Sequence, residues 1–461
     1  MLRMLFLLLF TVACSAGAQA CDCAGPAAPE KAFEEAKAVY TAHTVALQKN
    51  QHGFAEKVEL TVDKTWKGAP GKSITVDSLR RGCAFMGFED NTQYIIYQQP
   101  SWDKQAPDDV NISSCSRTKK LADGQIESRY LDAIAAGKET AAIDASLPAE
   151  LTGAEDPKVR AEAAALLGWM TWNAEKRLPA DAAAALIKAV SDKEPAVRIA
   201  AARSLSHRSL AVKPEAKQAL LQMLTSDNVD VRDAAASGLS MAGRDAVSHK
   251  ALVEALAGAR KNPNADKKRQ EGTIYAFARA LAETQATLEQ QAETVTLLTA
   301  MVDEVSDPYN RVGVIQHLGF QKEKARQAVP KLLEVLKTVD NDHLRQYTIH
   351  ALGDIGAAEA QPAIAPYLND KSCYVSSAVI TAESKIDPAG FGAFLKQKAM
   401  PVLETRFDAC AAEYSWGFQA VGKPAAPLEP FLAKKHAAMD NADWKKATLK
   451  NVLDMLRAQK K

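Results

Sequence analysis

Residues 194–205 read EPAVRIAAARSL, and this stretch decides the fold because it recurs along the chain. Residues 156–167 and 228–239 repeat the same order: a polar start, a Val-Arg pair, small residues and a closing leucine. Weaker copies centre on Arg269, Arg311 and Arg345, and successive copies lie 34 to 42 residues apart. Repeats of about this length are typical of solenoids built from pairs of helices.

The residues of each copy have plain physical roles. A polar or acidic residue caps the helix, and Pro fits its first turn. Alanines let neighbouring helices approach closely, while leucines at helical spacing fill the core between repeats. The arginine is expected to pair with an acidic group in an adjacent repeat, which is a structural role. The pattern resembles HEAT repeats, and the resemblance implies an α-solenoid over residues 148–457, about two-thirds of the chain.

The chain before the repeats has a different character and predicts a small β-barrel. Alternating residues rich in β-formers predict several strands, and helical segments flank them. A polar linker at 138–147 separates this region from the solenoid. The expected strands are 38–47, 58–62, 73–76 and 94–97, and the expected helices are 30–37 and 128–136.

The first residues predict export. Arg3 precedes an apolar run over residues 4–13, and Ala18-Gln19-Ala20 forms a signal-peptidase site. Residues 1–20 are therefore expected to be a signal peptide, and neither this run nor any later one is long enough for a permanent membrane span. The mature protein is expected to be secreted or periplasmic. The alternative is a lipid anchor on Cys14 or Cys21.

The cysteines fit an oxidising compartment. Removal of the signal leaves six: Cys21, Cys23, Cys83, Cys115, Cys373 and Cys410. An even number in an exported protein predicts three disulfides. Four cysteines lie in the first quarter of the chain, and the last two lie about one repeat apart. The last two are expected to join adjacent helix pairs near the end of the solenoid.

Residues 21–137 resemble the tissue inhibitors of metalloproteinases (TIMPs) and related netrin-like modules. The mature Cys21-Asp22-Cys23 start, the Gly82-Cys83 step and the Ser114–Thr118 segment around Cys115 carry the resemblance. It implies an OB-fold barrel with disulfides Cys21–Cys83 and Cys23–Cys115, which would fix the N-terminal segment on the barrel.

The resemblance also implies an inhibitory ridge. The α-amino nitrogen and carbonyl oxygen of Cys21 would bind the zinc of a target protease at its open coordination position. The rest of the ridge would be Asp22, Cys23, Leu79, Arg80, Arg81 and Gly82. Two departures narrow the range of targets. Asp22 stands where the family has a small or aliphatic side chain, and a buried carboxylate is costly without a cation. The cysteine-rich second domain of animal inhibitors is replaced by the solenoid.

Other function classes have little support in the sequence. The net charge of +1 and the lack of a basic tract argue against nucleic acid as a partner. Gly71-Lys72-Ser73 lacks the upstream glycine of a phosphate loop, and the chain has no His-Glu-x-x-His. His343 and His350 are interpreted as solvated or packing residues rather than metal ligands. We therefore expect a protein that is not an enzyme, has no cofactor of its own and binds a protein, with a zinc metalloproteinase as the candidate target. A non-inhibitory scaffold with purely structural cysteines is the alternative.

Overall fold

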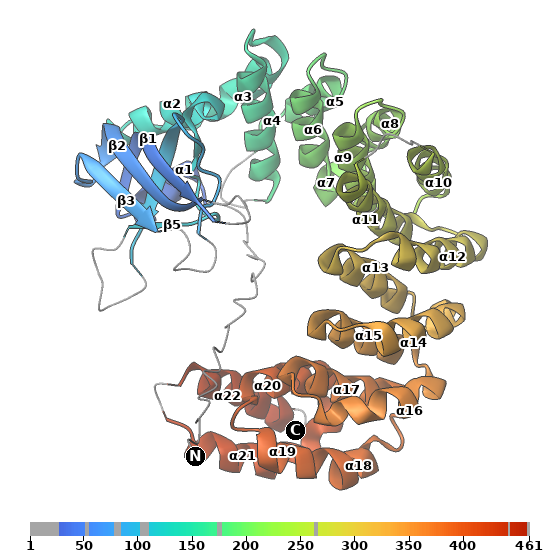
Figure 1. Cartoon of the computed structure of the whole chain (residues 1–461). Coiled ribbons are helices and arrows are strands. Elements are labelled where there is room, and N and C mark those ends of the chain that lie inside the picture. Colours follow the sequence, from blue (N-terminus) through green and yellow to red (C-terminus); the bar gives the residue numbers. More distant parts are fainter. Residues whose placement is uncertain are drawn as a thin grey trace, which may run out of the picture. The chain divides into compact units, whose positions relative to one another are not determined.

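In the computed structural model the chain forms two compact units, Met1–Ser204 and Leu205–Lys461. The structure describes residues 27–50, 55–77, 84–101, 110–172, 178–261, 266–440 and 443–458. The first unit holds an antiparallel sheet and the first repeat helices, and the second holds the remaining repeats (Figure 1). The chain is thus a small sheet region followed by a mostly helical solenoid, as the sequence predicts.

The sheet has six strands in the order β3-β2-β1-β4-β5, with β6 also paired to β4. All four strands expected from the alternating pattern are present. The longest pair, β1 and β2, contains several register shifts, and irregularities of this kind bend a sheet. The strands are β1 Ala38–Lys49, β2 Ala55–Lys67, β3 Ser73–Asp77, β4 Gln93–Gln99, β5 Asn111–Ile112 and β6 Lys119–Lys120.

The expected closed barrel is wrong for the described strands, which form an open sheet. Strand β3 pairs with β2 alone, and no pairing within the described residues joins it to the other edge. The reason lies in the short strands at that edge. β5 and β6 have two residues each and bond opposite ends of β4, so neither offers an edge long enough to close a barrel.

Both faces of the sheet are covered. Tyr40, Leu60 and Ile96 lie in the core on one face. On the other face, Tyr97 packs with α1 (Pro29–Glu35), and Leu131 of α2 (Gln125–Ala135) belongs to the same core. The sheet therefore buries both faces, but the second face depends on helices from the two ends of the region.

The stretch 138–147, expected as a linker, mostly belongs to a helix. Helix α3 spans Ala141–Gly153, and Thr140 just before it donates a hydrogen bond to Glu30 of α1. Sequence composition misses this helix because its charged and polar residues resemble those of a linker. The unit continues through α4 Pro157–Trp172, α5 Ala182–Ala189 and α6 Pro195–Leu205.

The second unit is built from helix pairs. One helix from each repeat packs against its counterpart in the next, and we call this row α9, α11, α13, α15, α17, α20 and α22 the ladder layer. Helices α10, α12, α14 and α21 each pack against the ladder helix that follows them. The helices are α7 Arg208–Ala211, α8 Pro214–Met223, α9 Val229–Ser240, α10 Ala246–Arg260, α11 Lys267–Thr284, α12 Leu288–Glu304, α13 Pro308–Phe320, α14 Val329–Thr338, α15 Asp342–Ile355, α16 Gln361–Ile364, α17 Cys373–Ile386, α18 Phe391–Phe394, α19 Met400–Arg406, α20 Ala411–Val421, α21 Glu429–Ala438 and α22 Trp444–Ala458.

Small residues bring the ladder helices together. A Cβ added to Gly353 of α15 would lie 2.7 Å from the Cα of Ala382 on α17. A Cβ on Gly319 of α13 would lie 3.0 Å from the Cα of Ala351 on α15. The alanines expected to allow close approach therefore do so together with glycines on the facing helix.

Replacing Gly353 with alanine should destabilise the protein by about 1–3 kcal/mol, because the new methyl group meets the backbone of Ala382. Gly272→Ala, in the interior of α11, is the matched control, since its Cβ would meet nothing within 4 Å. The control should gain about 0.5–1 kcal/mol from helix propensity. Urea unfolding measures both free energies, and equal changes in the two variants would contradict close packing at Gly353.

Candidate functional site

The predicted inhibitory ridge lies outside the described residues. This holds for Cys21, Asp22 and Cys23 and for the segment from Leu79 to Cys83. The structure does describe the residues that follow each segment and the region around Cys115, and these show what lies beside the predicted ridge.

The residues next to the predicted cysteines meet at one edge of the sheet. Ala84, which follows Cys83, forms an antiparallel bridge with Ser113. The guanidinium of Arg117 donates a hydrogen bond to the carbonyl oxygen of Ala27 at 3.1 Å. Cys115 lies between these two contacts and is disulfide-bonded. A groove of about 270 Å³ at this edge is lined by Ala27, Gln99, Cys115 and Arg117, among others.

Arg117 belongs to a buried ionic cluster. Its side chain donates to both carboxylate oxygens of Glu127 on α2, at 2.6 and 2.5 Å, and the hydroxyl of Tyr97 donates to Glu127 at 2.6 Å. Glu127 is fully buried. Burial alone would raise the pKa of Glu127, but the positive charges of Arg117 and Lys119 outweigh it and lower that pKa to about 2. Both charged groups are therefore satisfied inside the protein.

A second buried carboxylate joins the sheet region to the first repeats. Glu162 on α4 accepts the backbone N–H groups of Ile126 and Glu127 at 2.7 and 3.1 Å, so it caps the N-terminus of α2. Arg117 also lies over the ring of Trp169 on α4, 5.5 Å from its centroid. Burial raises the pKa of Glu162. The sheet region and α4 therefore share one polar cluster.

The sequence did not predict this cluster, although one signal points to it. Glu162 stands in the run AEAAALL, and a charged side chain among apolar repeat residues needs a partner. Its partners could not be identified, because they are backbone N–H groups at the start of α2, in the sheet region rather than in a repeat.

The repeat arginines have the expected structural role, and the expected acidic partner in an adjacent repeat is present for Arg160 and for Arg269, which pairs with Asp230. Arg160 pairs with Asp192, which precedes the next repeat, at 2.7 Å. Arg198 and Arg232 instead donate to carbonyl oxygens of the turn just before their own helix. Arg160 makes the same bonds to the carbonyls of Ala154 and Glu155. The shared function of these arginines is thus to hold the turn that starts the helix.

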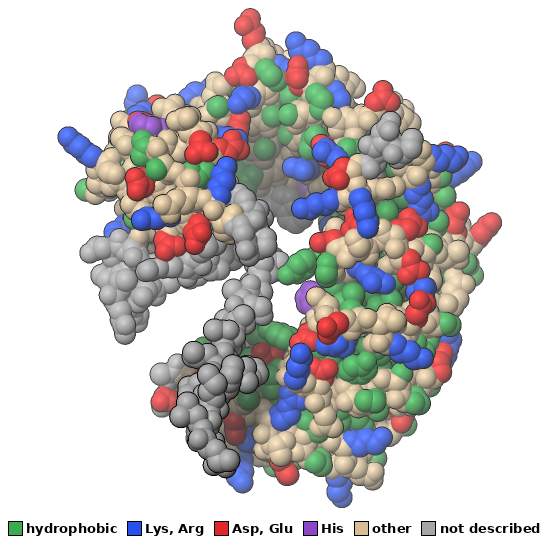
Figure 2. Space-filling view, viewed as in Figure 1, with side chains coloured by type: hydrophobic (Ala, Val, Ile, Leu, Met, Phe, Trp, Pro, Cys, Tyr) green, Lys and Arg blue, Asp and Glu red, His purple; other side chains and the backbone are tan. Residues whose placement is uncertain are grey.

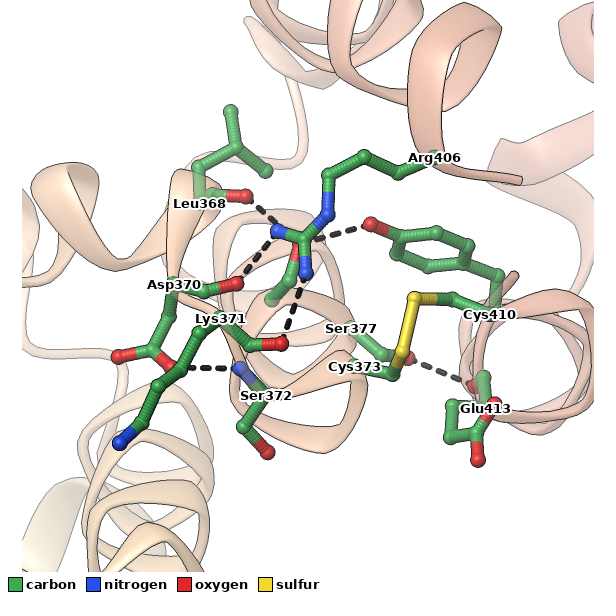
Figure 3. Close-up of a disulfide and its surroundings, with 11 residues drawn as sticks. Leu368, Asp370, Lys371, Ser372, Cys373, Ser377, Arg406, Cys410 and Glu413 are labelled. Atoms are coloured by element: carbon green, nitrogen blue, oxygen red, sulfur yellow. Dashed lines mark hydrogen bonds between the residues drawn. A yellow bond between two sulfur atoms is a disulfide. The ribbon is translucent and has the colours of Figure 1, made fainter. Parts of the chain in front are cut away.

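Cys373 and Cys410 form a disulfide with an S–S distance of 2.00 Å. Cys373 is the first residue of α17 and Cys410 is the N-cap of α20, so the bond joins the starts of two ladder helices (Figure 3). Around it, Ser377 donates to the carbonyl oxygen of Glu413 at 2.8 Å, and Arg406 donates to the carbonyl of Lys371 at 3.0 Å. The two helices are therefore tied at several points.

Exposed aromatic side chains cross the same helices. We call Tyr374, Trp416 and Trp444, from α17, α20 and α22, the aromatic row. Their exposed fractions are 46, 43 and 59 %. The rings of Tyr374 and Trp416 stack with centroids 6.3 Å apart, and those of Trp416 and Trp444 are 6.4 Å apart. Contiguous exposed aromatic surface is typical of binding sites.

A groove of about 310 Å³ lies beside the aromatic row, and we call it the α15–α20 groove. Tyr347 of α15, Tyr374 and Trp416 supply rings to its lining. The polar lining includes Gln346, Thr381 and Glu413.

The two histidines expected to be packing residues contact aromatic rings. His343 lies 4.8 Å from the ring of Tyr347, and His350 lies 6.0 Å from it on the same helix. Burial lowers the pKa of His350 to about 4, so this side chain is neutral at pH 7. Among the described residues, no three His, Cys, Asp or Glu side chains come together as metal ligands.

Charge is mixed over the visible face of the molecule. Figure 2 shows Lys and Arg side chains interspersed with Asp and Glu, without a broad region of one sign. None of the helices in the described part of the chain combines the length and apolar character needed to cross a bilayer.

Comparisons with known proteins support the repeat part of the chain. Residues 145–240 match the family described as HEAT repeats. A structure of importin beta in a polyethylene glycol condition matches with a TM-score of 0.53 and 13% identity, over 77% of this chain and 51% of that chain. A chain from a structure of Kap95p with RanGDP gives a TM-score of 0.43 and 15% identity, over 72% and 47% of the two chains. A designed armadillo repeat protein gives 0.35 and 18%, over 46% and 99%.

At these identities the likeness to importin beta shows the fold alone. The protein spans about half the length of the importin beta chain and of the chain from the Kap95p structure. No curated protein matches the sequence. The matches support HEAT repeats and do not support a TIMP-like domain.

The buried cluster predicts a pH-dependent loss of stability. Glu127→Gln should cost about 3–5 kcal/mol at pH 7, because it leaves the buried guanidinium of Arg117 without its counter-charge. The folded pKa of Glu127 is about 2, below its ordinary 4.5, so its contribution is present above pH 4.5 and is lost as pH falls toward 2. The difference in unfolding free energy between wild type and variant, measured with urea, should therefore become smaller as pH falls from 4.5 toward 2.

Glu89→Gln is the control for this experiment. Glu89 pairs with Lys120 at 2.6 Å, but its side chain is 59 % exposed, so the change should cost less than about 1 kcal/mol. A cost for Glu127→Gln as small as that of the control would contradict the role given to the cluster.

Proposed function

We propose that this protein is an exported, non-enzymatic scaffold that binds a protein partner through the aromatic row. The observation that carries the proposal is the exposure of three large aromatic side chains on successive ladder helices. Solenoids of stacked repeats present long surfaces of this kind for protein binding. The Cys373–Cys410 disulfide supports export, because such bonds persist in oxidising compartments.

Site-specific photo-crosslinking in the cells that naturally produce the protein tests the scaffold. A photo-crosslinking residue at Trp444 should yield a discrete cross-linked protein, and Trp416→Ala should weaken that product about tenfold, as expected for the loss of an aromatic contact worth 1–2 kcal/mol. Leu288 is the matched control position, since it is 73 % exposed but lies on α12, outside the ladder layer. Equal products from the two positions, or none from Trp444, would reject the aromatic row as the binding surface.

A second function, inhibition of a zinc metalloproteinase, is favoured by one specific observation. Ala84, which follows Cys83, and Ala27, the first described residue after Cys23, both contact the segment that carries Cys115. The pairs that the resemblance implies, Cys21–Cys83 and Cys23–Cys115, agree with this placement and would hold the N-terminal segment at the sheet edge. The amine and carbonyl of Cys21 would then chelate the target's zinc, with little entropy lost on binding. Asp22 requires a target pocket that offers a cation or the metal itself.

The inhibitor proposal is tested by adding one alanine before Cys21. Inhibition of a panel of zinc metalloproteinases should be abolished, since the α-amino group moves away from the chelate, while the unfolding free energy should not change. Intact mass must first show that the mature chain begins at Cys21 and carries no acyl group. Equal inhibition by the extended and native proteins would exclude chelation by the N-terminus.

A further inference from the structure

The α15–α20 groove is lined by aromatic rings. Tyr347, Tyr374 and Trp416 come from three consecutive ladder helices, and the last two remain partly exposed. The face of an aromatic ring carries partial negative charge and attracts cations placed over it. The walls therefore favour a positively charged ligand group over an anionic one.

The charge of the groove agrees with its walls. Glu413 lies in the lining, and within the described residues its carboxylate forms no ion pair. The histidine of the lining, His350, is neutral because burial lowers its pKa. Lys385, whose charge acts on His350, is already bound to Asp354 at 2.6 Å. The groove thus presents one carboxylate without a counter-charge.

The groove is also rigid. The Cys373–Cys410 disulfide lies one residue before Tyr374, so it fixes the start of α17 against the start of α20, the helix that carries Glu413 and Trp416. The hydroxyl of Ser377 binds the carbonyl of Glu413 at 2.8 Å, and Gly417 lets Ser377 approach α20 closely. A site held in this way loses little conformational entropy when a ligand binds.

We propose that the α15–α20 groove binds a lysine or arginine side chain presented by an extended segment of the protein partner. The cation lies against Tyr374 and Trp416 and pairs with Glu413. The polar side chains of the lining contact the backbone of the bound segment. Charge complementarity selects this occupant, because an acidic segment would meet Glu413 and the π faces unfavourably. This inference rests on the scaffold function proposed above and specifies the chemistry of its partner.

Fluorescence anisotropy of a labelled peptide, acetyl-Gly-Lys-Gly-Lys-Gly-amide, tests the proposal at physiological salt. The full-length protein should bind the peptide, and acetylation of both lysines should abolish measurable binding. Trp416→Ala and Glu413→Gln should each weaken binding about five- to thirtyfold, as expected for loss of a cation–π contact or a charge-assisted hydrogen bond. Because Glu413→Gln conserves size, it remains informative if Trp416→Ala disturbs folding.

Glu404→Gln is the matched control, since Glu404 is an exposed carboxylate on α19 outside the groove lining. It should bind like the wild type. Undiminished binding by Glu413→Gln, equal binding of the acetylated peptide, or no binding of the lysine peptide would each overturn the proposal. If the basic peptide fails while cross-linking from Trp444 still depends on Trp416, the scaffold function stands and the cation-binding groove is wrong.

Discussion

Within each unit, the repeats bury their apolar surface against neighbouring repeats, and this dependence is the constraint on which the rest of the structure rests. Within the second unit the constraint is met by close crossings such as Gly353 against Ala382. At the start of the repeats it is met differently. Helix α4 lies against the sheet region. There the carboxylate of Glu162 accepts backbone N–H groups at the start of α2, and Arg117 pairs with Glu127. The sheet region therefore serves as the N-terminal cap of the solenoid.

The repeats could be predicted from sequence because the residues that determine each copy lie within one short segment. The Val-Arg pair and the closing leucine recur at fixed offsets in the three clearest copies, with proline in two of them, and the arginine bonds are local to the turn that precedes each helix. The strands could likewise be predicted from the alternation of apolar and polar residues. Whether the sheet closes into a barrel could not be predicted, because closure depends on edge strands of two residues whose pairing no periodic pattern reveals. Likewise, the polar composition of residues 138–147 does not show that α3 begins at Ala141.

The candidate sites also differ in how far the sequence could predict them. The ridge around Cys21 came from a resemblance, and its residues lie outside those described by the structure. The aromatic row could not be found in the sequence, since Tyr374, Trp416 and Trp444 are separated by 42 and 28 residues. They meet only because successive repeats stack. Glu413, whose carboxylate forms no ion pair among the described residues, is equally invisible without the fold, because it is one acidic residue among 56.

The local arginine bonds have a consequence for the order in which the chain folds. A bond from Arg198 to carbonyls five and six residues earlier closes a very short loop, whereas pairing Ala38 with Gln98 in the sheet closes one of sixty residues. Loop closure costs more entropy as loops lengthen, and proteins rich in distant contacts fold more slowly. We therefore expect the helical repeats to form before β1 pairs with β4, although both strands are synthesised first. The β1–β2 hairpin closes locally at Lys49 and Ala55, so the edge of β1 that later pairs with β4 would stay unpaired during synthesis.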